Sequence, residues 1–274
     1  MDAELKALIE ETWAEYKTFE SLDVVKKVPP IMFVGDVDAY KQSEIKIITV
    51  ALNPSKNGAD PDVRAREFPE WFGIDNATLS KNPEKYLKGL QEYFEKDPAT
   101  AYFRAFEPIL NGMETNYYSP GKLGHESYHN RALHTDLCSQ LTTEPNWGGL
   151  ENDVKKSLAK TSSDLWIKLV KGLKPDLILV SFGTAYLKWL KLELCDGTKR
   201  VKDLRTWDKI CEVPGKKPYI VNGLLHKIDL KQPPTGLIVH GRNSTFGQPF
   251  NTASGNKKEI GSNILRYMKD HGII

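Results

Sequence analysis

The chain has 274 residues, of which 40% are hydrophobic, and this is enough for one sizeable core, so we expect a single domain over residues 1–274. No apolar run approaches the roughly 20 residues that a membrane helix needs, and residues 1–16 are not patterned as a signal peptide, so we expect a cytoplasmic protein. The formal net charge of +2 does not by itself indicate a nucleic-acid partner, because affinity for phosphates depends on a local basic surface.

The predicted elements begin with a helix over residues 3–20, inside an N-terminal helical extension placed at 1–22, because apolar residues recur there at helical spacing. The β-branched run 45–52 then predicts a strand that is buried on both faces and stops at an Asn-Pro pair. Residues 83–112, within a helical insertion at 76–130, carry aromatic residues that we assign to the core rather than to base stacking.

Further strands follow in the second half of the chain. The apolar run 177–182 predicts a strand that leads into a helix after Gly183. Residues 218–225 and 236–240 predict two more strands, and 257–270 predicts a C-terminal helix. Because buried strands alternate with helices, the predicted fold class is α/β, a three-layer α/β/α sandwich with a central, mostly parallel sheet.

The cysteines give no indication of a disulfide or a metal centre. Cys138, Cys195 and Cys211 lie far apart, and none belongs to a C-x-x-C pair. We interpret them as reduced structural thiols, as expected in the cytoplasm. The sequence therefore predicts a protein that uses neither a metal nor a cofactor.

Polar residues follow the predicted strands at the points where an open parallel sheet binds its ligands. Asn53 ends the first strand, in a turn of sequence Asn-Pro-Ser-Lys-Asn-Gly. Asp136 ends the short apolar stretch 132–137, and His240 leads the strand 236–240 into a polar loop that contains glycine. Taken singly, a strand-end Asp or His is at least as often structural as functional, so the three matter only as a set.

Taken in order, four motifs resemble those of the uracil-DNA glycosylase superfamily. They are a strand followed by N-P-S and Gly, then T-D-L, then K-P-D-L-I-L-V-S-F-G, and finally a strand followed by H-G-R-N-S. The resemblance spans about residues 45–270 and implies a central four-stranded parallel sheet between helices. It also implies a monofunctional DNA glycosylase, which flips one nucleotide out of DNA and hydrolyses the bond between its base and deoxyribose.

The resemblance assigns roles to the three strand-end residues. Asn53 matches the position that holds the attacking water against C1′, and His240 matches the histidine that stabilises the departing base. Asp136 matches the position that reads the base edge. The chain departs from the family in having Gly241-Arg242-Asn243 where Pro-Ser-Pro is common.

Base flipping predicts two further groups of residues. A side chain must fill the hole in the duplex, and the candidates for this wedge are Arg242 and Phe246. Trp71 or Phe72 is the predicted aromatic face on which the flipped base stacks, with a buried structural aromatic as the alternative. The residues expected to contact DNA are Lys56, Arg242, Asn243, Ser244 and Phe246.

Two departures from the family bear on which base is removed. An ionised Asp136 can only accept hydrogen bonds, which favours the amino group of cytosine. Uracil-specific relatives place a tyrosine after the D-P pair, where its ring abuts C5, whereas Ser55 leaves room there. We therefore predict as substrate a C5-modified cytosine of the kind found in bacteriophage DNA, in repair or in antiviral defence. A uracil or mismatch repair glycosylase is the alternative.

Three other interpretations stay open at this point. The chain could be a non-catalytic nucleic-acid-binding member of the same fold, although binding alone would not need both Asn53 and His240. An α/β enzyme that acts on free nucleosides or nucleotides would share the strand-end chemistry without a DNA groove. Lys56 could form a Schiff base as in a lyase, although a phosphate contact explains it more simply. We expect a monomer with DNA as its partner.

Overall fold

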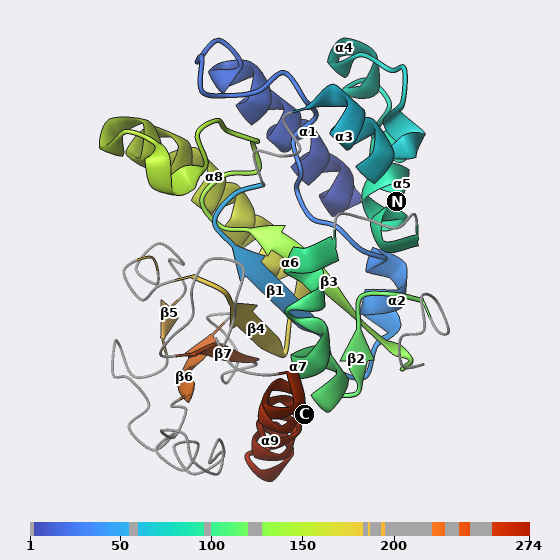
Figure 1. Ribbon diagram of the computed structural model, residues 1–274, viewed down its shortest axis with the longest axis vertical. Helices are drawn as coiled ribbons and strands as arrows, with labels where there is room; N and C mark the ends of the chain where they lie inside the picture. Colours follow the sequence, from blue (N-terminus) through green and yellow to red (C-terminus); the bar gives the residue numbers. More distant parts are fainter. Residues whose placement is uncertain are drawn as a thin grey trace.

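One sheet of seven strands in the order β2-β3-β1-β4-β7-β6-β5 organises the described part of the chain, and helices pack against it (Figure 1). The five strands from β2 to β7 run parallel, and β6 and β5 are antiparallel to their neighbours. The α/β fold class is therefore confirmed. The computed structural model describes residues 3–54, 60–95, 100–119, 128–182, 186, 193–194, 221–227, 236–241 and 254–274.

The predicted number of four strands is too small, because short strands extend the sheet at both edges. β2 and β5 have two residues each, which is too short to show any periodicity in the sequence. The four central parallel strands nevertheless include three of the predicted runs. The strands are β1 (Ile47–Ala51), β2 (Thr115–Asn116), β3 (Asn130–Asp136), β4 (Leu177–Val180), β5 (Glu193–Leu194), β6 (Val221–Lys227) and β7 (Gly236–Gly241).

The helices begin at residues that suit a helix N-terminus. Side-chain oxygens of Asp36, Asp60, Asp75 and Asn82 accept hydrogen bonds from backbone N–H groups of the first turns of α2 to α5. The predicted helical stretch 83–112 is divided into three helices. The α-helices are α1 (Ala3–Phe19), α2 (Val37–Gln42), α3 (Pro61–Glu67), α4 (Asn76–Leu79), α5 (Pro83–Gln91), α6 (Thr100–Arg104), α7 (Glu107–Gly112), α8 (Asn152–Leu173) and α9 (Ser254–Asp270).

Helices cover both faces of the sheet, because neighbouring residues of a strand point to opposite sides. On β3, His134 lies against Tyr102 and Phe103 of α6, with ring centroids 5.2 and 5.1 Å apart. The next residue, Thr135, accepts a 3.0 Å hydrogen bond from the Trp166 indole of α8. There is thus a helical layer on each side of β3, as the predicted three-layer arrangement requires.

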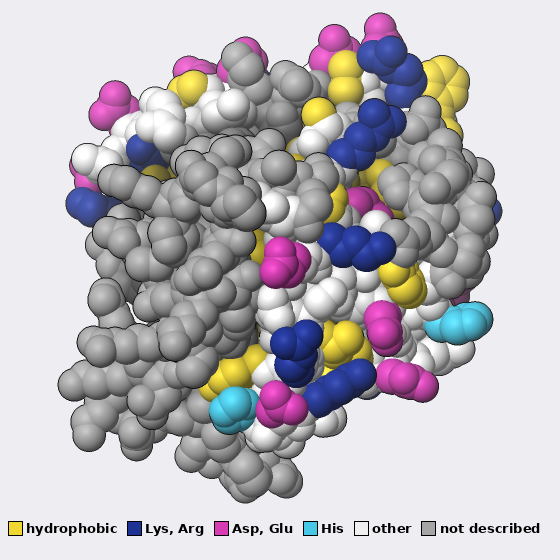
Figure 2. Space-filling view, turned by 60° about the horizontal axis from the view of Figure 1, so that its bottom comes forward, with side chains coloured by type: hydrophobic (Ala, Val, Ile, Leu, Met, Phe, Trp, Pro, Cys, Tyr) yellow, Lys and Arg dark blue, Asp and Glu magenta, His cyan; other side chains and the backbone are white. Residues whose placement is uncertain are grey.

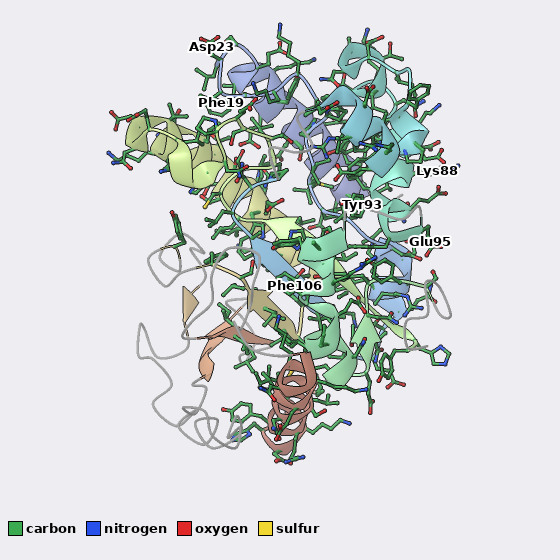
Figure 3. All side chains as sticks on the ribbon, in the orientation of Figure 1. Phe19, Asp23, Lys88, Tyr93, Glu95 and Phe106 are labelled. Carbon is green, nitrogen blue, oxygen red and sulfur yellow. The ribbon has the colours of Figure 1, made fainter. Side chains whose placement is uncertain are left out.

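The buried hydrophobic side chains form one continuous core that reaches from Leu5 in α1 to Met268 in α9. The aromatic residues of the predicted insertion belong to this core, and Tyr93 and Phe106, which Figure 3 labels, are both buried. The interpretation of these aromatics as core residues is therefore confirmed. Among the described residues, no helix has both the length and the apolar character needed to cross a membrane.

Two glycines allow α7 and α9 to cross at close range. A Cβ atom at Gly112 would lie 2.0 Å from the carbonyl oxygen of Lys258, and one at Gly261 would lie 2.1 Å from the carbonyl oxygen of Ile109. Any larger residue at either position would force the two backbones apart. The C-terminal helix therefore packs directly on the backbone of the predicted insertion.

The contact between α1 and α8 contains a buried carboxyl group, which leads to a prediction about stability. Glu15 is 3% exposed, and one of its oxygens accepts a hydrogen bond from the Ser162 hydroxyl. Burial raises the pKa of Glu15 to about 7. This carboxyl therefore favours folding fully at acidic pH, below its ordinary pKa, and its contribution is lost as the pH rises through 7.

Replacing Glu15 by Gln should make the protein more stable at pH 8 than the unmodified chain, by about 3 kcal/mol if the whole effect of burial on the pKa of Glu15 is relieved. At pH 4 the difference should vanish or reverse. Urea unfolding at the two pH values measures it. Glu11→Gln is the matched control on the same helix, because Glu11 is exposed and pairs with Lys168, and it should leave the pH dependence unchanged.

Candidate functional site

The residues that end the central strands meet at one edge of the sheet. Because β3, β1, β4 and β7 are parallel neighbours, their carboxyl ends share this edge. Ala51 pairs with Asp136, Val180 pairs with His240, and Asn53 follows two residues after β1. Across the sheet the four strands are ordered β3-β1-β4-β7, so β1, the first of them in the chain, lies between the second and the third. In sheets with this strand order, ligands bind in the crevice between the first and third strands, which are β1 and β4 here.

Asn53 is buried just beyond β1, with 3% of its surface exposed. Its Nδ2 atom donates a 2.9 Å hydrogen bond to the hydroxyl of Thr143. Its Oδ1 atom is buried and has no hydrogen-bond partner among the described residues. Such an atom costs about 1–3 kcal/mol, and a donor that binds at this edge of the sheet would remove that cost.

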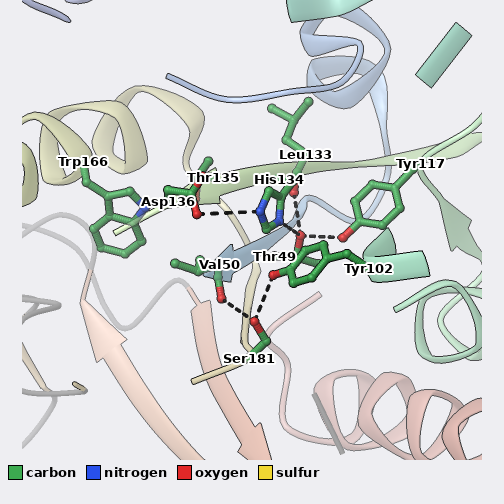
Figure 4. Close-up of polar contacts among 10 residues, drawn as sticks. All are labelled: Thr49, Val50, Tyr102, Tyr117, Leu133, His134, Thr135, Asp136, Trp166 and Ser181. Atoms are coloured by element: carbon green, nitrogen blue, oxygen red, sulfur yellow. Dashed lines mark hydrogen bonds and ion pairs between the residues drawn. The ribbon is translucent and has the colours of Figure 1, made fainter. Parts of the chain in front are cut away.

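Asp136 ends β3 and is also buried, at 4% exposed. Its Oδ1 atom lies 3.9 Å from His134 Nε2, which is too long for a hydrogen bond, and has no hydrogen-bond partner among the described residues (Figure 4). This is a second buried oxygen without a partner at the same edge of the sheet. Asn53 follows β1 and Asp136 ends β3, and these two strands are neighbours in the sheet.

The protonation of Asp136 differs from the sequence-based expectation. Burial raises the pKa of this carboxyl to about 8, and the positive charge of Arg64 offsets only part of that effect. At pH 7 most molecules therefore carry the neutral acid, which has one donor and one acceptor. The prediction of an ionised, acceptor-only Asp136 is wrong at neutral pH, because it assumed a solvated side chain.

A buried arginine adds a positive charge that the motif pattern did not identify. Arg64 of α3 donates a 2.7 Å hydrogen bond to the Thr142 hydroxyl and lies 3.4 Å from Glu67 Oε2. Its guanidinium carbon is 5.3 Å from the centroid of the Phe68 ring. Burial lowers the pKa of Arg64, and nearby acidic groups, Asp136 among them, oppose this. Its hydrogen bond to the loop after β3 and its electrostatic interaction with Asp136 connect it with the site.

Below the carboxyl edge, hydrogen bonds fix the side chains of the sheet face that carries Asp136 (Figure 4). The hydroxyl of Thr49 lies 2.8 Å from His134 Nδ1 and 2.5 Å from the hydroxyl of Tyr117. The hydroxyls of Tyr102 and Ser181 are 3.0 Å apart. Burial lowers the pKa of His134 to about 3, so this imidazole is neutral at physiological pH. It acts as a rigid neutral support beside Asp136.

The structure places the remaining predicted residues only in part. His240 belongs to β7, and its register beside Val180 puts its backbone at the carboxyl edge. Six predicted residues lie outside the described residues, and their roles stay predictions. They are Ser55, Lys56, Arg242, Asn243, Ser244 and Phe246.

The two predicted stacking residues have opposite environments. Both faces of the Trp71 indole are covered, by Phe68 at 4.2 Å with an interplanar angle of 3° and by Tyr86 at 5.3 Å with 6°. Trp71 is therefore a core side chain, which was the structural alternative for it, and neither face is open to a base. Phe72 is 74% exposed, so its ring lies at the surface.

A surface cavity of about 520 Å³ lies away from this site, near the start of β3 and the segment before β1. Its lining includes Glu44, Glu114, His129 and Asn130. The Asn130 amide accepts a hydrogen bond from the backbone N–H of Glu44 and donates one to the carbonyl of Glu114. Since this side chain already serves the fold, we assign the site to the carboxyl edge and not to the cavity.

The surface charges on the face drawn in Figure 2 are mixed. Lys and Arg side chains are interspersed there with Asp and Glu, and the described residues on this face do not form a single basic patch. The distribution thus adds no electrostatic support for a DNA partner.

In comparisons with protein-family models, curated proteins and solved structures, nothing matches this chain. The resemblance to the uracil-DNA glycosylase superfamily is therefore still a prediction from the ordered motifs alone.

Proposed function

We propose that the chain is a monofunctional DNA glycosylase that hydrolyses the N-glycosidic bond of a flipped-out pyrimidine. The observation that carries the proposal is the pair of buried oxygens, Asn53 Oδ1 and Asp136 Oδ1, which have no hydrogen-bond partner among the described residues. They lie at one edge of the sheet, which β7 and His240 share. Cleavage builds positive charge on the sugar and negative charge on the base, and these residue types suit both needs.

In the proposed mechanism each residue has a separate task. The Asn53 carbonyl accepts a hydrogen bond from a water molecule and holds it against C1′ of the flipped nucleotide. Asp136 hydrogen-bonds the polar edge of the base. His240 donates a hydrogen bond to the pyrimidine O2 and so stabilises the negative charge that develops as the bond to the base breaks. The water attacks C1′ as the base departs, and its proton is released to solvent.

For the substrate we propose a C5-substituted pyrimidine, with a modified cytosine as the first choice. The neutral acid of Asp136 can accept from the amino group of cytosine and donate to N3, but turned over it also complements O4 and N3–H of uracil. Asp136 therefore does not separate the two bases. Ser55 supports the C5 substituent, because it stands where uracil-specific members of the superfamily have a tyrosine that excludes such substituents.

The test is to incubate the purified protein with duplexes that contain 5-hydroxymethylcytosine, its glucosylated form, uracil, thymine opposite guanine, or cytosine as control. We expect alkali-labile abasic sites at the C5-modified cytosines and none at plain cytosine. Cleavage of uracil alone would reject the substrate class. Tight DNA binding without abasic sites would reject catalysis and favour a binding protein. A Schiff base that borohydride reduces to a covalent protein–DNA adduct would indicate a lyase that uses Lys56.

A further inference from the structure

The loop that follows β3 is fixed by the segment that follows α1. Backbone N–H groups of Lys26 and Glu144 donate to the carbonyls of Thr142 and Val24, at 3.0 and 2.9 Å. Thr143, between the two loop residues, is fully buried and forms an isolated bridge with Val25. The backbone of Thr143 is therefore held in place, and its side chain extends from there to Asn53.

A directed chain of hydrogen bonds joins this loop to the amide of Asn53. The hydroxyl of Thr143 donates to the carbonyl of Pro145 at 2.9 Å, because a carbonyl oxygen can only accept. With its one proton so committed, Thr143 Oγ1 can only accept at its second contact, 2.9 Å from Asn53. The Asn53 atom that faces it must then be the Nδ2 donor, so the direction of the amide follows from the network.

We infer that Thr143 is a positioning residue that locks the Asn53 side chain with its carbonyl oxygen toward the reacting sugar, an inference that rests on the proposed glycosylase function. The carbonyl is the group that Asn53 leaves without a partner. In this orientation it accepts a hydrogen bond from the bound water, and a lone pair of that water is free to face C1′. A turned amide would donate to the water and point its lone pair away from C1′.

The same chain gives a local reason for an amide at position 53. A carboxylate there would place an acceptor against Thr143 Oγ1, whose proton already serves Pro145. One of the two hydrogen bonds would then be lost. The Thr143–Pro145 pair thus favours Asn over Asp, which is the form of the first motif that this chain carries.

The experiment compares Thr143→Val, which removes the acceptor, with Thr143→Ser, which keeps it. Thr143→Val should lower kcat on the best substrate by about 10- to 100-fold while KM changes by less than about twofold, and Thr143→Ser should restore most of the rate. Thr135→Val is the matched control. Thr135 is an equally buried threonine that accepts an N–H hydrogen bond, from Trp166 on the other face of β3, and its loss should leave kcat near that of the unmodified protein.

A second measurement does not depend on activity. In protein labelled with ¹⁵N-asparagine, the Nδ2 protons of Asn53 should exchange slowly with water, and should exchange at least about tenfold faster in Thr143→Val but not in Thr143→Ser. Unchanged kcat in Thr143→Val, or equally fast exchange in the unmodified protein, would overturn the inference. If no duplex is cleaved but Nδ2 exchange is faster in Thr143→Val only, Thr143 does fix the Asn53 amide and the proposed glycosylase function is wrong.

Discussion

Replacing Asn53 by alanine should lower the single-turnover rate of abasic-site formation by about 100-fold or more, with little change in DNA affinity. The physical reason is that the buried Oδ1 atom, which has no partner among the described residues, is the group that holds the water. Without this oxygen, a water molecule near C1′ is no longer held in the orientation that attack requires. Rates measured with excess enzyme on the best duplex, together with fluorescence anisotropy for binding, separate the chemical step from affinity.

Two further variants complete this test. His240→Ala should lower the rate to a similar extent, through lost stabilisation of the base anion. Asn76→Ala removes an asparagine amide whose Nδ2 atom donates to the Tyr16 hydroxyl elsewhere in the fold, and it should retain the rate. If Asn53→Ala cleaves as fast as Asn76→Ala, Asn53 does not position the water and the proposed mechanism is wrong.

The activity of the unmodified protein should fall as the pH rises through about 8, and Asp136→Asn should abolish this alkaline decrease. The neutral acid has one donor and one acceptor, as an amide does, whereas the ionised form can only accept. Ionisation at high pH therefore removes the hydrogen bond that Asp136 donates to the base. It also adds repulsion between the carboxylate and the acceptor atom of the base that it faces. At pH 6 the two proteins should act at rates within about tenfold of each other.

Among the described residues, the following groups near Asp136 do not account for this pH dependence. His134 is neutral at these pH values, and burial raises the pKa of Cys138, Tyr93 and Tyr102. Burial lowers the pKa of Arg64, but an arginine guanidinium stays protonated at these pH values.

Stability must be followed in parallel, because ionisation of the same buried carboxyl also weakens folding as the pH rises through 8. Circular dichroism at each pH separates lost folding from lost activity. The same alkaline decrease in Asp136→Asn, with both proteins folded, would show that another group controls it.

The sequence predicts the central strands well because they are buried on both faces and consist of continuous apolar runs. β1 and β4 fall inside their predicted ranges, and β7 extends one residue beyond its own. β3 begins two residues before its predicted apolar stretch 132–137, since it also buries the polar residues Asn130 and Arg131. Apolar periodicity does not detect the part of a strand whose buried residues are polar.

The candidate site is predictable only where it coincides with the ends of strands. Asn53 and Asp136 could be found because parallel strands bring their carboxyl ends to one edge. Thr143 and Arg64 could not, since their importance depends on contacts across 90 and 78 residues of sequence, with Asn53 and Thr142. The protonation of Asp136 also depends on burial by distant helices, which a linear pattern does not contain.

The glycine crossing of α7 and α9 changes how the chain can be shortened. α9 is far from the predicted insertion 76–130 in sequence, yet it packs on the backbone around Gly112, which lies inside that insertion. Excising residues 76–130 would expose the apolar side of α9 to water. Truncating the chain before α9 would expose the apolar side of α7. Engineering of a smaller protein from this fold should therefore keep or remove the two segments together.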